Sequence, residues 1–263
     1  MLRAFSSKAL LIVLVLAAVF GLAVFLHWPA EDQDHSLALS ATARPSDGYE
    51  SQRRRMVEEQ LAARGIKDKN VLAAMRKVPR HEYITKDLRS EAYSDWPLPI
   101  GHGQTISQPY IVALMTELLQ PKKTDRILEI GTGSGYQAAV LAEIVDEVWT
   151  VEIIKELGER AKKILEEKYP EKAKVKVADG YYGWEEGAPF DGILITCAAN
   201  NIPAPLLKQL KEGGRIVLPM EGLFFNQNLT VVEKRKGGEI VTRNVCAVAF
   251  VPMTGAVRKQ SRE

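Results

Sequence analysis

The stretch RILEIGTGSGY, residues 126–136, decides the fold of this 263-residue chain. A short apolar run with one acid leads into a glycine-dense turn, and a helix-forming run follows at 137–144. This order predicts a strand, a tight turn and the start of a helix. Gly131, Gly133 and Gly135 lack the Cβ atoms that would keep the backbone away from a ligand, and the N-terminus of the helix points at the same place. The stretch therefore predicts a site that holds a nucleoside-bearing cofactor against bare backbone.

The spacing of these glycines narrows the choice of cofactor. The dinucleotide-binding fingerprint is G-x-G-x-x-G, whereas the third glycine here comes one residue early, at Gly135, and Tyr136 follows it. No Lys-Ser or Lys-Thr pair follows the glycines, which excludes a phosphate-binding P-loop. The pattern E-x-G-x-G-x-G at 129–135 resembles the first motif of S-adenosylmethionine-dependent methyltransferases. On this motif alone, a methyltransferase and another nucleotide-binding α/β domain both remain open.

Two further acids favour a cofactor site. Glu152 ends a strand-like run at 147–152, roughly 20 residues beyond the turn, where Rossmann-type domains place a ribose-binding carboxylate. Asp179 ends a third such run at 175–179. Either acid alone is as well explained as a solvated strand end. Both follow the glycine turn in the order expected of acids that converge on one crevice at the carboxyl ends of parallel strands.

The stretch DWPLPIGHGQTISQPY, residues 95–110, is a loop by composition, because it holds three prolines and two glycines. It closely resembles the substrate loop of the protein-L-isoaspartate O-methyltransferases. The resemblance continues through VPRHEY at 78–83, GGRIVLP at 213–219 and FVPMT at 250–254, and it covers roughly residues 49–254. The loop is far more specific to this family than the glycine turn.

The resemblance implies an α/β fold, a Rossmann-like class I methyltransferase with a mostly parallel, doubly wound sheet. The pattern agrees, since strands and helices alternate. Strands are expected at 126–130, 148–151, 175–177, 193–196 and 215–218, and helices at 111–119, 137–144, 155–168 and 205–210. Strands at 229–233 and 245–251 predict an antiparallel C-terminal edge. Helices at 50–64 and 69–78 form an N-terminal helical segment.

Three parts are expected along the chain. Residues 1–27 form a hydrophobic anchor or signal segment, and 28–48 form a linker. Residues 49–263 form the methyltransferase domain. Within that domain, 49–120 hold the N-terminal helices and the substrate loop, and 121–263 hold the cofactor-binding sheet.

The resemblance also implies the reaction and its substrate-side residues. The enzyme transfers a methyl group from S-adenosyl-L-methionine to the free carboxylate of L-isoaspartyl residues in damaged proteins, leaving S-adenosyl-L-homocysteine. Ser107 matches the active-site serine of the family, and Gln104 and Thr254 match positions on the substrate side. A carboxylate is already ionised at pH 7, so we expect Ser107 to orient it by a hydrogen bond. Ser107 is also a candidate N-cap of the next helix, and the two roles are compatible.

The cofactor contacts implied by the resemblance come from the turn, the strand-end acids and the loop. The three glycines of the turn lie at the methionine and ribose side. Glu152 accepts from the ribose hydroxyls, Asp179 from the adenine amino group, and Glu129 orients the methionine amine. Thr105 and Ile106 lie against the cofactor.

The charge and the residue composition of the chain indicate which classes of ligand or partner to expect. The net charge is +2, which gives no sign of the basic face that nucleic acid would require. Two cysteines and four histidines show no metal-ligand spacing, so no metal site is expected. We expect a monomer that acts on isoaspartyl proteins and peptides. The alternatives are a carboxyl methyltransferase for a small-molecule acid and a non-catalytic, membrane-tethered domain that binds S-adenosylmethionine.

Residues 9–26 form an uncharged run about as long as the shortest bilayer-spanning helix, which predicts membrane attachment by an uncleaved anchor. Arg3 and Lys8 precede the run and acids follow it, so the positive-inside rule places the domain outside the cytoplasm, on the periplasmic side or exported. The cofactor is held inside the cell, and a misassigned start codon would also explain the extension. We therefore expect a cytoplasmic active site.

Overall fold

The computed structural model describes residues 48–222 and 226–257. The chain divides between Pro45 and Ser46 into two units, and the second unit holds every described residue. The expected anchor at 9–26 lies outside the described residues. Within the described ranges, no helix has both the length and the apolar character needed to cross a bilayer.

The N-terminal helical segment is built differently from the single helix expected at 50–64. It consists of the α-helix α1 (Glu50–Arg55), the π-helix η1 (Met56–Leu61) and the 3₁₀ helix η2 (Ala62–Arg64), followed by α2 (Lys69–Lys77). Met56, Val57 and Leu61 are the buried residues of η1. Gly65, at a φ of 98°, is the C-cap residue of η2.

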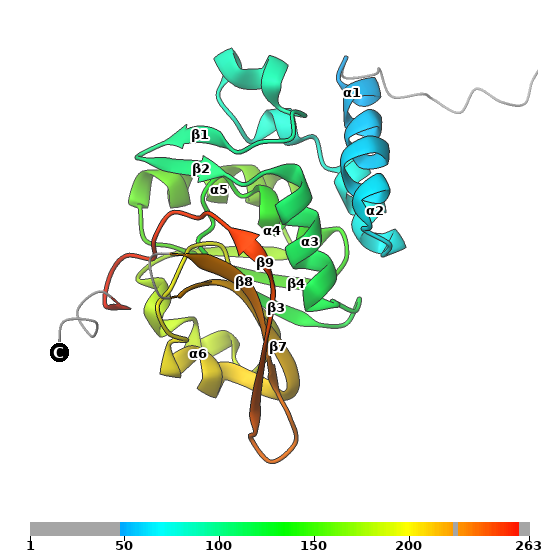
Figure 1. The fold of residues 1–263 in the computed structure, drawn as a ribbon. Helices are drawn as coiled ribbons and strands as arrows, with labels where there is room; N and C mark the ends of the chain where they lie inside the picture. The colour runs from blue at the N-terminus through cyan, green and yellow to red at the C-terminus, as the bar shows by residue number, and fades with distance from the viewer. Residues whose placement is uncertain (1–47, 223–225, 258–263) are drawn as a thin grey trace, which may run out of the picture. The chain divides into compact units, whose positions relative to one another are not determined.

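Seven strands form one mixed sheet in the order β5-β4-β3-β6-β7-β8-β9 (Figure 1). They are β3 (Arg126–Ile130), β4 (Glu147–Glu152), β5 (Ala173–Val177), β6 (Phe190–Ile195), β7 (Leu210–Glu221), β8 (Gln227–Lys234) and β9 (Ile240–Val248). β3 to β7 pair in parallel, whereas β8 pairs antiparallel with β7 and β9 pairs antiparallel with β8. The expected parallel sheet with an antiparallel C-terminal edge is confirmed.

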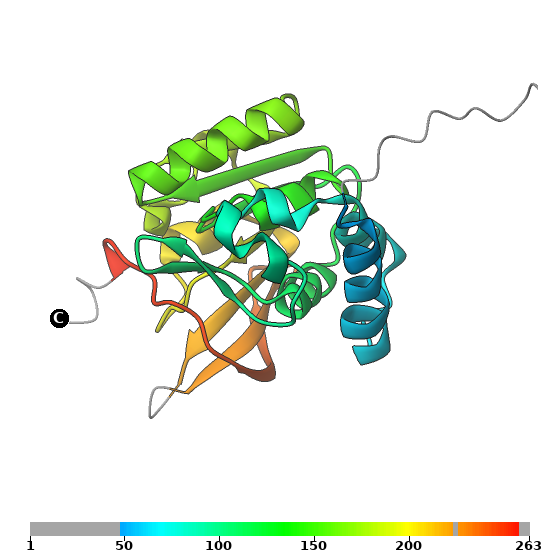
Figure 2. The same ribbon diagram turned by 90° about the horizontal axis from the view of Figure 1, so that it is seen from above.

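Helices cover both faces of this sheet, as Figures 1 and 2 show. They are α3 (Pro109–Leu119), α4 (Tyr136–Ala142), α5 (Lys155–Lys168) and α6 (Ala204–Gln209). Side chains alternate between two cores. Ile127 and Leu194 lie in the core with α3, α4 and α5, whereas Leu128 and Ile193 lie in the core with α6. The doubly wound Rossmann-like arrangement expected from the sequence is therefore present.

The loop at 95–110 contains structure that its composition did not predict. β1 (Leu98–Gly101) and β2 (Gln104–Ile106) pair as an antiparallel hairpin. Gly101, His102 and Gly103 form its turn at positive φ. The remaining short 3₁₀ helices are η3 (Arg80–Glu82), η4 (Lys86–Glu91), η5 (Gly180–Tyr182) and η6 (Glu185–Gly187). The β1–β2 hairpin and the segment after β9 approach the carboxyl ends of the parallel strands (Figure 1).

Candidate active site

Three adjoining cavities lie where the parallel strands end. The turn cavity, of about 340 Å³, is lined by the glycine turn, the end of β4, the β1–β2 hairpin and the segment after β9. The loop groove, of about 480 Å³, runs between residues 97–111 and residues 247–251. The inner cavity, of about 40 Å³, lies beneath the turn, beside α3 and α4. Thr105 and Thr196 line all three, so the cavities share one junction.

The first two glycines of the turn present bare backbone to the turn cavity. Gly131 has a φ of 97°, and a Cβ there would lie 2.4 Å from Thr196 Oγ1. Gly133 also adopts positive φ, at 53°. Only glycine fits the Gly131 position without displacing Thr196, so this wall of the cavity is necessarily free of side chains.

Gly135 has a different role from the other two. It is the N-cap residue of α4 at a φ of 85°, and a Cβ would meet Ala161 at 3.3 Å and Leu165 at 3.4 Å. The position lies against α5, and Gly135 is not among the residues that line the three cavities. Its place fits close packing between two helices, whereas we expected contact with the cofactor.

Glu152 lies at the end of β4 and lines the turn cavity. Its side chain is buried, and both carboxylate oxygens accept backbone hydrogen bonds. Oε2 accepts from Gly133 N at 2.8 Å, and Oε1 accepts from Ile154 N at 2.9 Å. The carboxylate is therefore fixed in place, and each oxygen keeps a second lone pair for another donor.

Glu129 is fully buried beneath the turn and lines the inner cavity. Its Oε2 accepts a hydrogen bond from the Thr150 hydroxyl, whose oxygen lies 2.6 Å from that of Thr132. Its Oε1 is buried and has no hydrogen-bond partner. Burial raises the pKa of Glu129 to about 8, the charge of Glu152 adds to the rise, and the bond from Thr150 opposes it. A buried, unpartnered carboxylate oxygen suits a cationic ligand group.

Asp179 differs from the other strand-end acids. Its Oδ1 accepts from Tyr181 N at 2.9 Å, and its Oδ2 accepts from Ala256 N at 2.7 Å. The turn cavity is lined by its neighbour Gly180, and Asp179 is not among the lining residues. The structure thus turns this carboxylate toward the segment after β9, whereas we expected it to face adenine.

Ser107 lies where the hairpin meets α3, and it lines both the loop groove and the inner cavity. The N-cap of α3 is Gln108, and no side chain caps that helix end. The alternative interpretation of Ser107 as a helix cap is therefore wrong. Gln108 instead donates from Nε2 to the carbonyl oxygen of Asp95 at 2.9 Å, which joins the two ends of the loop.

Three other predicted site residues line the turn cavity or the inner cavity. Gln104 and Thr254, both expected near substrate, line the turn cavity. Ile106 lines the inner cavity. His102, to which the sequence assigned no functional role, also lines the turn cavity, from the hairpin turn.

Thr196 is the site residue that sequence reasoning missed. Its hydroxyl donates to the carbonyl oxygens of Ile130, at 3.0 Å, and Gly131, at 2.6 Å. It thereby ties the end of β6 to the glycine turn. Side chains at the ends of parallel strands converge on one crevice, and Thr196 follows β6 directly, so the same rule that indicates the strand-end acids also applies to this hydroxyl. Among the described residues, no group of three His, Cys, Asp or Glu side chains could hold a metal ion.

Comparisons with known proteins agree on one family. The model of the family described as Protein-L-isoaspartate(D-aspartate) O-methyltransferase (PCMT) matches residues 51–258. Protein-L-isoaspartate O-methyltransferase 2 of Shewanella sediminis is 52% identical over 231 residues, which cover 88% of this chain and 94% of that protein. The protein of the same name from Syntrophobacter fumaroxidans is 46% identical over 250 residues, covering 95% and 98%.

Solved structures give the same result. A structure of a protein-L-isoaspartate O-methyltransferase superposes with a TM-score of 0.72 at 31% identity, covering 78% of this chain and 67% of that chain. A Plasmodium falciparum structure, named as a beta-aspartate methyltransferase (PCMT) in complex with S-adenosyl-L-homocysteine, has a TM-score of 0.67 at 28% identity. It covers 77% of this chain and 98% of that chain.

Proposed function

Since the chain belongs to the protein-L-isoaspartate(D-aspartate) O-methyltransferase family, we propose that its cavities divide the reaction between them. The turn cavity and inner cavity hold the cofactor, and the loop groove holds the isoaspartyl segment. The reaction is that of the family: a methyl group passes from S-adenosyl-L-methionine to the free carboxylate of an L-isoaspartyl residue, which initiates repair. S-adenosyl-L-homocysteine is the product.

The cofactor residues are assigned from the cavity walls. When bound, S-adenosylmethionine supplies an electrophilic methyl group on a sulfonium. Gly131 and Gly133 admit the ligand to the backbone, and Glu152 accepts from the ribose hydroxyls with its remaining lone pairs. The unpartnered Oε1 of Glu129 accepts from the methionine ammonium, and that positive charge favours the ionised carboxylate.

Ser107 orients the substrate. An isoaspartyl carboxylate has a reference pKa of about 4, so it is ionised at pH 7 and requires no general base. Its nucleophilicity would fall if a cation held it tightly, whereas a neutral hydroxyl donor positions it without neutralising it. Ser107 lines both the substrate groove and the inner cavity, which suits a donor placed between the two reactants. The chain therefore contributes position and exclusion of water.

The walls of the loop groove suit an extended peptide with little demand on its side chains. One side carries Pro97 and Ile111, and the other is the segment 247–251, all of whose residues are apolar. Its polar contributors are neutral hydroxyls and one amide, from Thr105, Ser107, Gln108 and Thr196. Such a groove accepts an apolar or polar neighbour of the isoaspartate without an opposing charge.

One observation supports the assignment: Thr105 and Thr196 line all three of the cavities described above, so a cofactor and a substrate held in them would meet at one junction. The test is methyl incorporation from labelled S-adenosylmethionine into an isoaspartyl peptide, its normal aspartyl twin and a small dicarboxylic acid. Incorporation into the isoaspartyl peptide alone is expected. Preference for the small acid would favour the alternative substrate, and binding without turnover would favour a non-catalytic domain.

The location of the enzyme is a separate part of the proposal. We infer that the apolar run at 9–26 attaches the chain to a membrane and that the active site lies on the cytoplasmic side, where the cofactor is held. A monomer is the expected form. Light scattering of the detergent-solubilised full chain tests the monomer. A C-terminal reporter that works in only one compartment tests the topology, and a signal from outside the cytoplasm would reverse it.

A further inference from the structure

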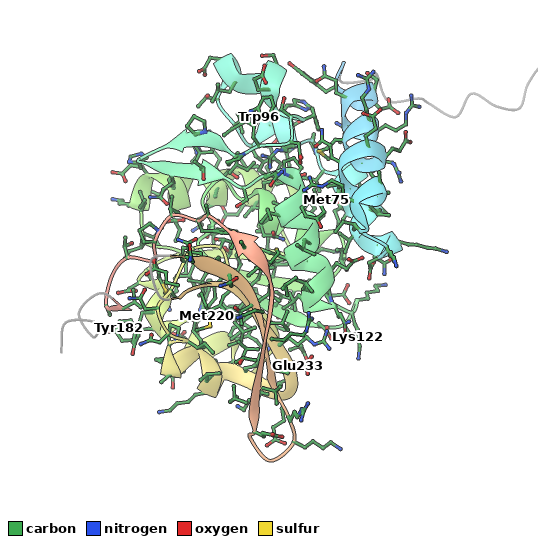
Figure 3. The ribbon with its side chains drawn as sticks, in the orientation of Figure 1. Met75, Trp96, Lys122, Tyr182, Met220 and Glu233 are labelled. Atoms are coloured by element: carbon green, nitrogen blue, oxygen red, sulfur yellow. The ribbon has the colours of Figure 1, made fainter. Side chains whose placement is uncertain are left out.

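The pairing between β8 and β9 stops before the end of the loop groove. Its last pair joins Gln227, the first residue of β8, to Val248, the last residue of β9. Met220 and Glu233, labelled in Figure 3, lie near the two ends of the neighbouring β7–β8 pairing, and Gln227 is at the Met220 end. The groove wall continues as far as Val251. Contacts other than the sheet ladder must therefore hold the part of the wall beyond Val248.

The side chain of Gln227 continues the pairing beyond the ladder. Its Oε1 accepts from Phe250 N at 2.6 Å, and its Nε2 donates to Phe250 O at 3.1 Å. One amide side chain thus pairs with both main-chain groups of a single residue, as a residue of a neighbouring strand would. The two bonds also fix the orientation of the amide, because the reversed amide would place donor against donor and acceptor against acceptor.

Phe250 belongs to the wall of the loop groove alone. It lines that groove and is not among the residues that line the turn cavity or the inner cavity. The next residue, Val251, lines both the groove and the turn cavity, but it has a separate partner, because Ala198 N donates to Val251 O at 2.9 Å. A change at Gln227 should therefore displace the groove wall and leave the wall of the turn cavity in place.

Gln227 acts on the groove from outside it. Its side chain is not among those that line the three cavities, whereas the ring of Phe250 packs against the core that includes α3. The ring fixes one side of Phe250, and the amide of Gln227 fixes its main chain. Without the amide, the N–H and C=O of Phe250 would lose these partners at a half-buried position, which is costly enough to shift the main chain.

We propose that Gln227 is a positioning residue for the substrate, which holds the main chain of Phe250 and thereby the shape of the groove wall at 247–251. This inference rests on the proposed role of the loop groove as the site of the isoaspartyl segment. Such a residue affects how well the peptide binds, but not the transfer of the methyl group once the peptide is in place. Its loss should therefore raise KM for the peptide and leave kcat nearly unchanged.

Two substitutions in the full chain test this role. Gln227→Met keeps the length of the side chain and removes both bonds. Gln227→Glu keeps the volume and the acceptor for Phe250 N, but it replaces the donor to Phe250 O with a second oxygen. With labelled S-adenosylmethionine, each variant should raise KM for an isoaspartyl peptide on the order of tenfold, the range that one or two hydrogen bonds support. Normal KM values in both variants would overturn the role.

Calorimetry separates peptide binding from turnover. Titration of the same peptide into each protein saturated with S-adenosyl-L-homocysteine should show a fall in peptide affinity that matches the rise in KM. Titration with S-adenosyl-L-homocysteine alone should give the wild-type affinity in both variants. Equal losses of affinity for the peptide and for S-adenosyl-L-homocysteine would overturn the role, because the substitution would then have loosened this end of the sheet as a whole.

Thr230→Val is the matched control. Thr230 lies on the same strand, and its hydroxyl donates to Asn244 Oδ1 on β9 at 2.9 Å, so this substitution also removes a side-chain bond between β8 and β9. Neither residue lines the groove. Thermal melts should show a loss of stability in the control, whereas its KM for the peptide should equal that of the wild type. A rise in KM as large as that of Gln227→Met would overturn the role of Gln227.

The wild type tests the premise in the same assays. It should bind and methylate the isoaspartyl peptide. A wild-type chain that binds S-adenosyl-L-homocysteine but neither binds nor methylates the peptide would contradict the proposed function of the loop groove itself, and the inference with it.

Discussion

The two walls of the turn cavity are built in different ways. The glycine turn is a local wall, because Gly131 and Gly133 lie in one short stretch directly after β3. The Gly131 amide bonds to Val151 and the Gly133 amide to Glu152, both on the neighbouring strand β4. The segment 251–257 after β9, here called the strap, is a remote wall, because the Asp179 carboxylate accepts a hydrogen bond from Ala256 across 77 positions of the chain.

The two walls therefore differ in how strongly a substitution in each should affect ligand binding. Sheet hydrogen bonds and the buried contact with Thr196 fix the turn, so it keeps its shape whatever the strap does. The strap is held by contacts with remote segments: two backbone hydrogen bonds with Ala198 at its start and one from Ala256 to the Asp179 carboxylate at its end. Changes in the turn should therefore abolish binding, whereas changes in the strap should weaken it.

The largest effect is expected from Gly131→Ala. The new Cβ would lie 2.4 Å from Thr196 Oγ1 at a φ of 97°, which combines overpacking with left-handed strain at a cost of roughly 2–5 kcal/mol. Affinity for S-adenosyl-L-homocysteine, measured by calorimetry, should fall more than about a hundredfold. Gly237→Ala is the control, because that glycine has a φ of 85° and open space around it. Nearly normal affinity of Gly131→Ala for S-adenosyl-L-homocysteine would show that the glycine turn does not form a wall of the ligand site.

Ser107→Ala tests a residue that belongs to neither wall, because Ser107 is not among the residues that line the turn cavity. Its turnover of isoaspartyl peptide should fall on the order of a hundredfold, since misplacement by about 1 Å has that effect on an in-line transfer. Affinity for S-adenosyl-L-homocysteine should fall far less than turnover, because Ser107 lines the inner cavity but not the turn cavity. Steady-state rates and calorimetry on one preparation provide the measurement. Normal turnover would move the substrate contact to another residue of 104–108.

Glu129→Gln tests the buried acid beneath the local wall. The pKa of Glu129 is raised from 4.5 to about 8, so the folded chain keeps a proton that the unfolded chain releases. This stabilisation is complete below pH 4.5 and is lost as the pH rises toward 8, at about 1.4 kcal/mol per pH unit. In thermal melts without ligand, wild type should lose stability relative to Glu129→Gln between pH 5 and 8. Parallel curves for the two proteins would show that Glu129 does not titrate there.

The smallest effect is expected from deleting residues 2–43, which precede both walls in the sequence. All described contacts of the two walls lie within residues 48–257. The shortened chain should match the full chain in affinity for S-adenosyl-L-homocysteine and in turnover of isoaspartyl peptide. An insoluble or inactive product would mean that the deleted part belongs to the domain.

The sequence predicts the features that depend on local patterns, but it does not predict the contacts between distant segments. The glycine turn, Glu152 and the alternating strands follow from short continuous patterns, because period and turn chemistry are local. The β1–β2 hairpin was missed because Pro97 and Pro99 favour a loop, yet Leu98 pairs with Ile106 and buries both side chains. Tertiary burial outweighed local preference there.

The remaining site features depend on contacts between distant segments. Thr196 enters the site only because β6 lies beside β3. Gly135 carries the motif of a cofactor glycine, but the approach of α5 makes it a packing position. Asp179 lies just beyond the end of β5 at Val177, as the N-cap of η5, and nothing in its neighbourhood in the sequence indicates that Ala256 donates to its carboxylate.

Residue-resolved amide hydrogen exchange of wild type and Asp179→Asn, with S-adenosyl-L-homocysteine bound, compares both walls in one experiment. The amides of Met253 and Ala256, in the segment 251–257, should exchange at least about tenfold faster in the variant, because this remote wall opens locally. The amides of Gly131 and Gly135, bonded to Val151 and Thr132, should exchange at the wild-type rate. Unchanged exchange rates for the strap amides, or an equal rise in exchange rate in both walls, would contradict the claim that Asp179 holds the strap independently of the glycine turn.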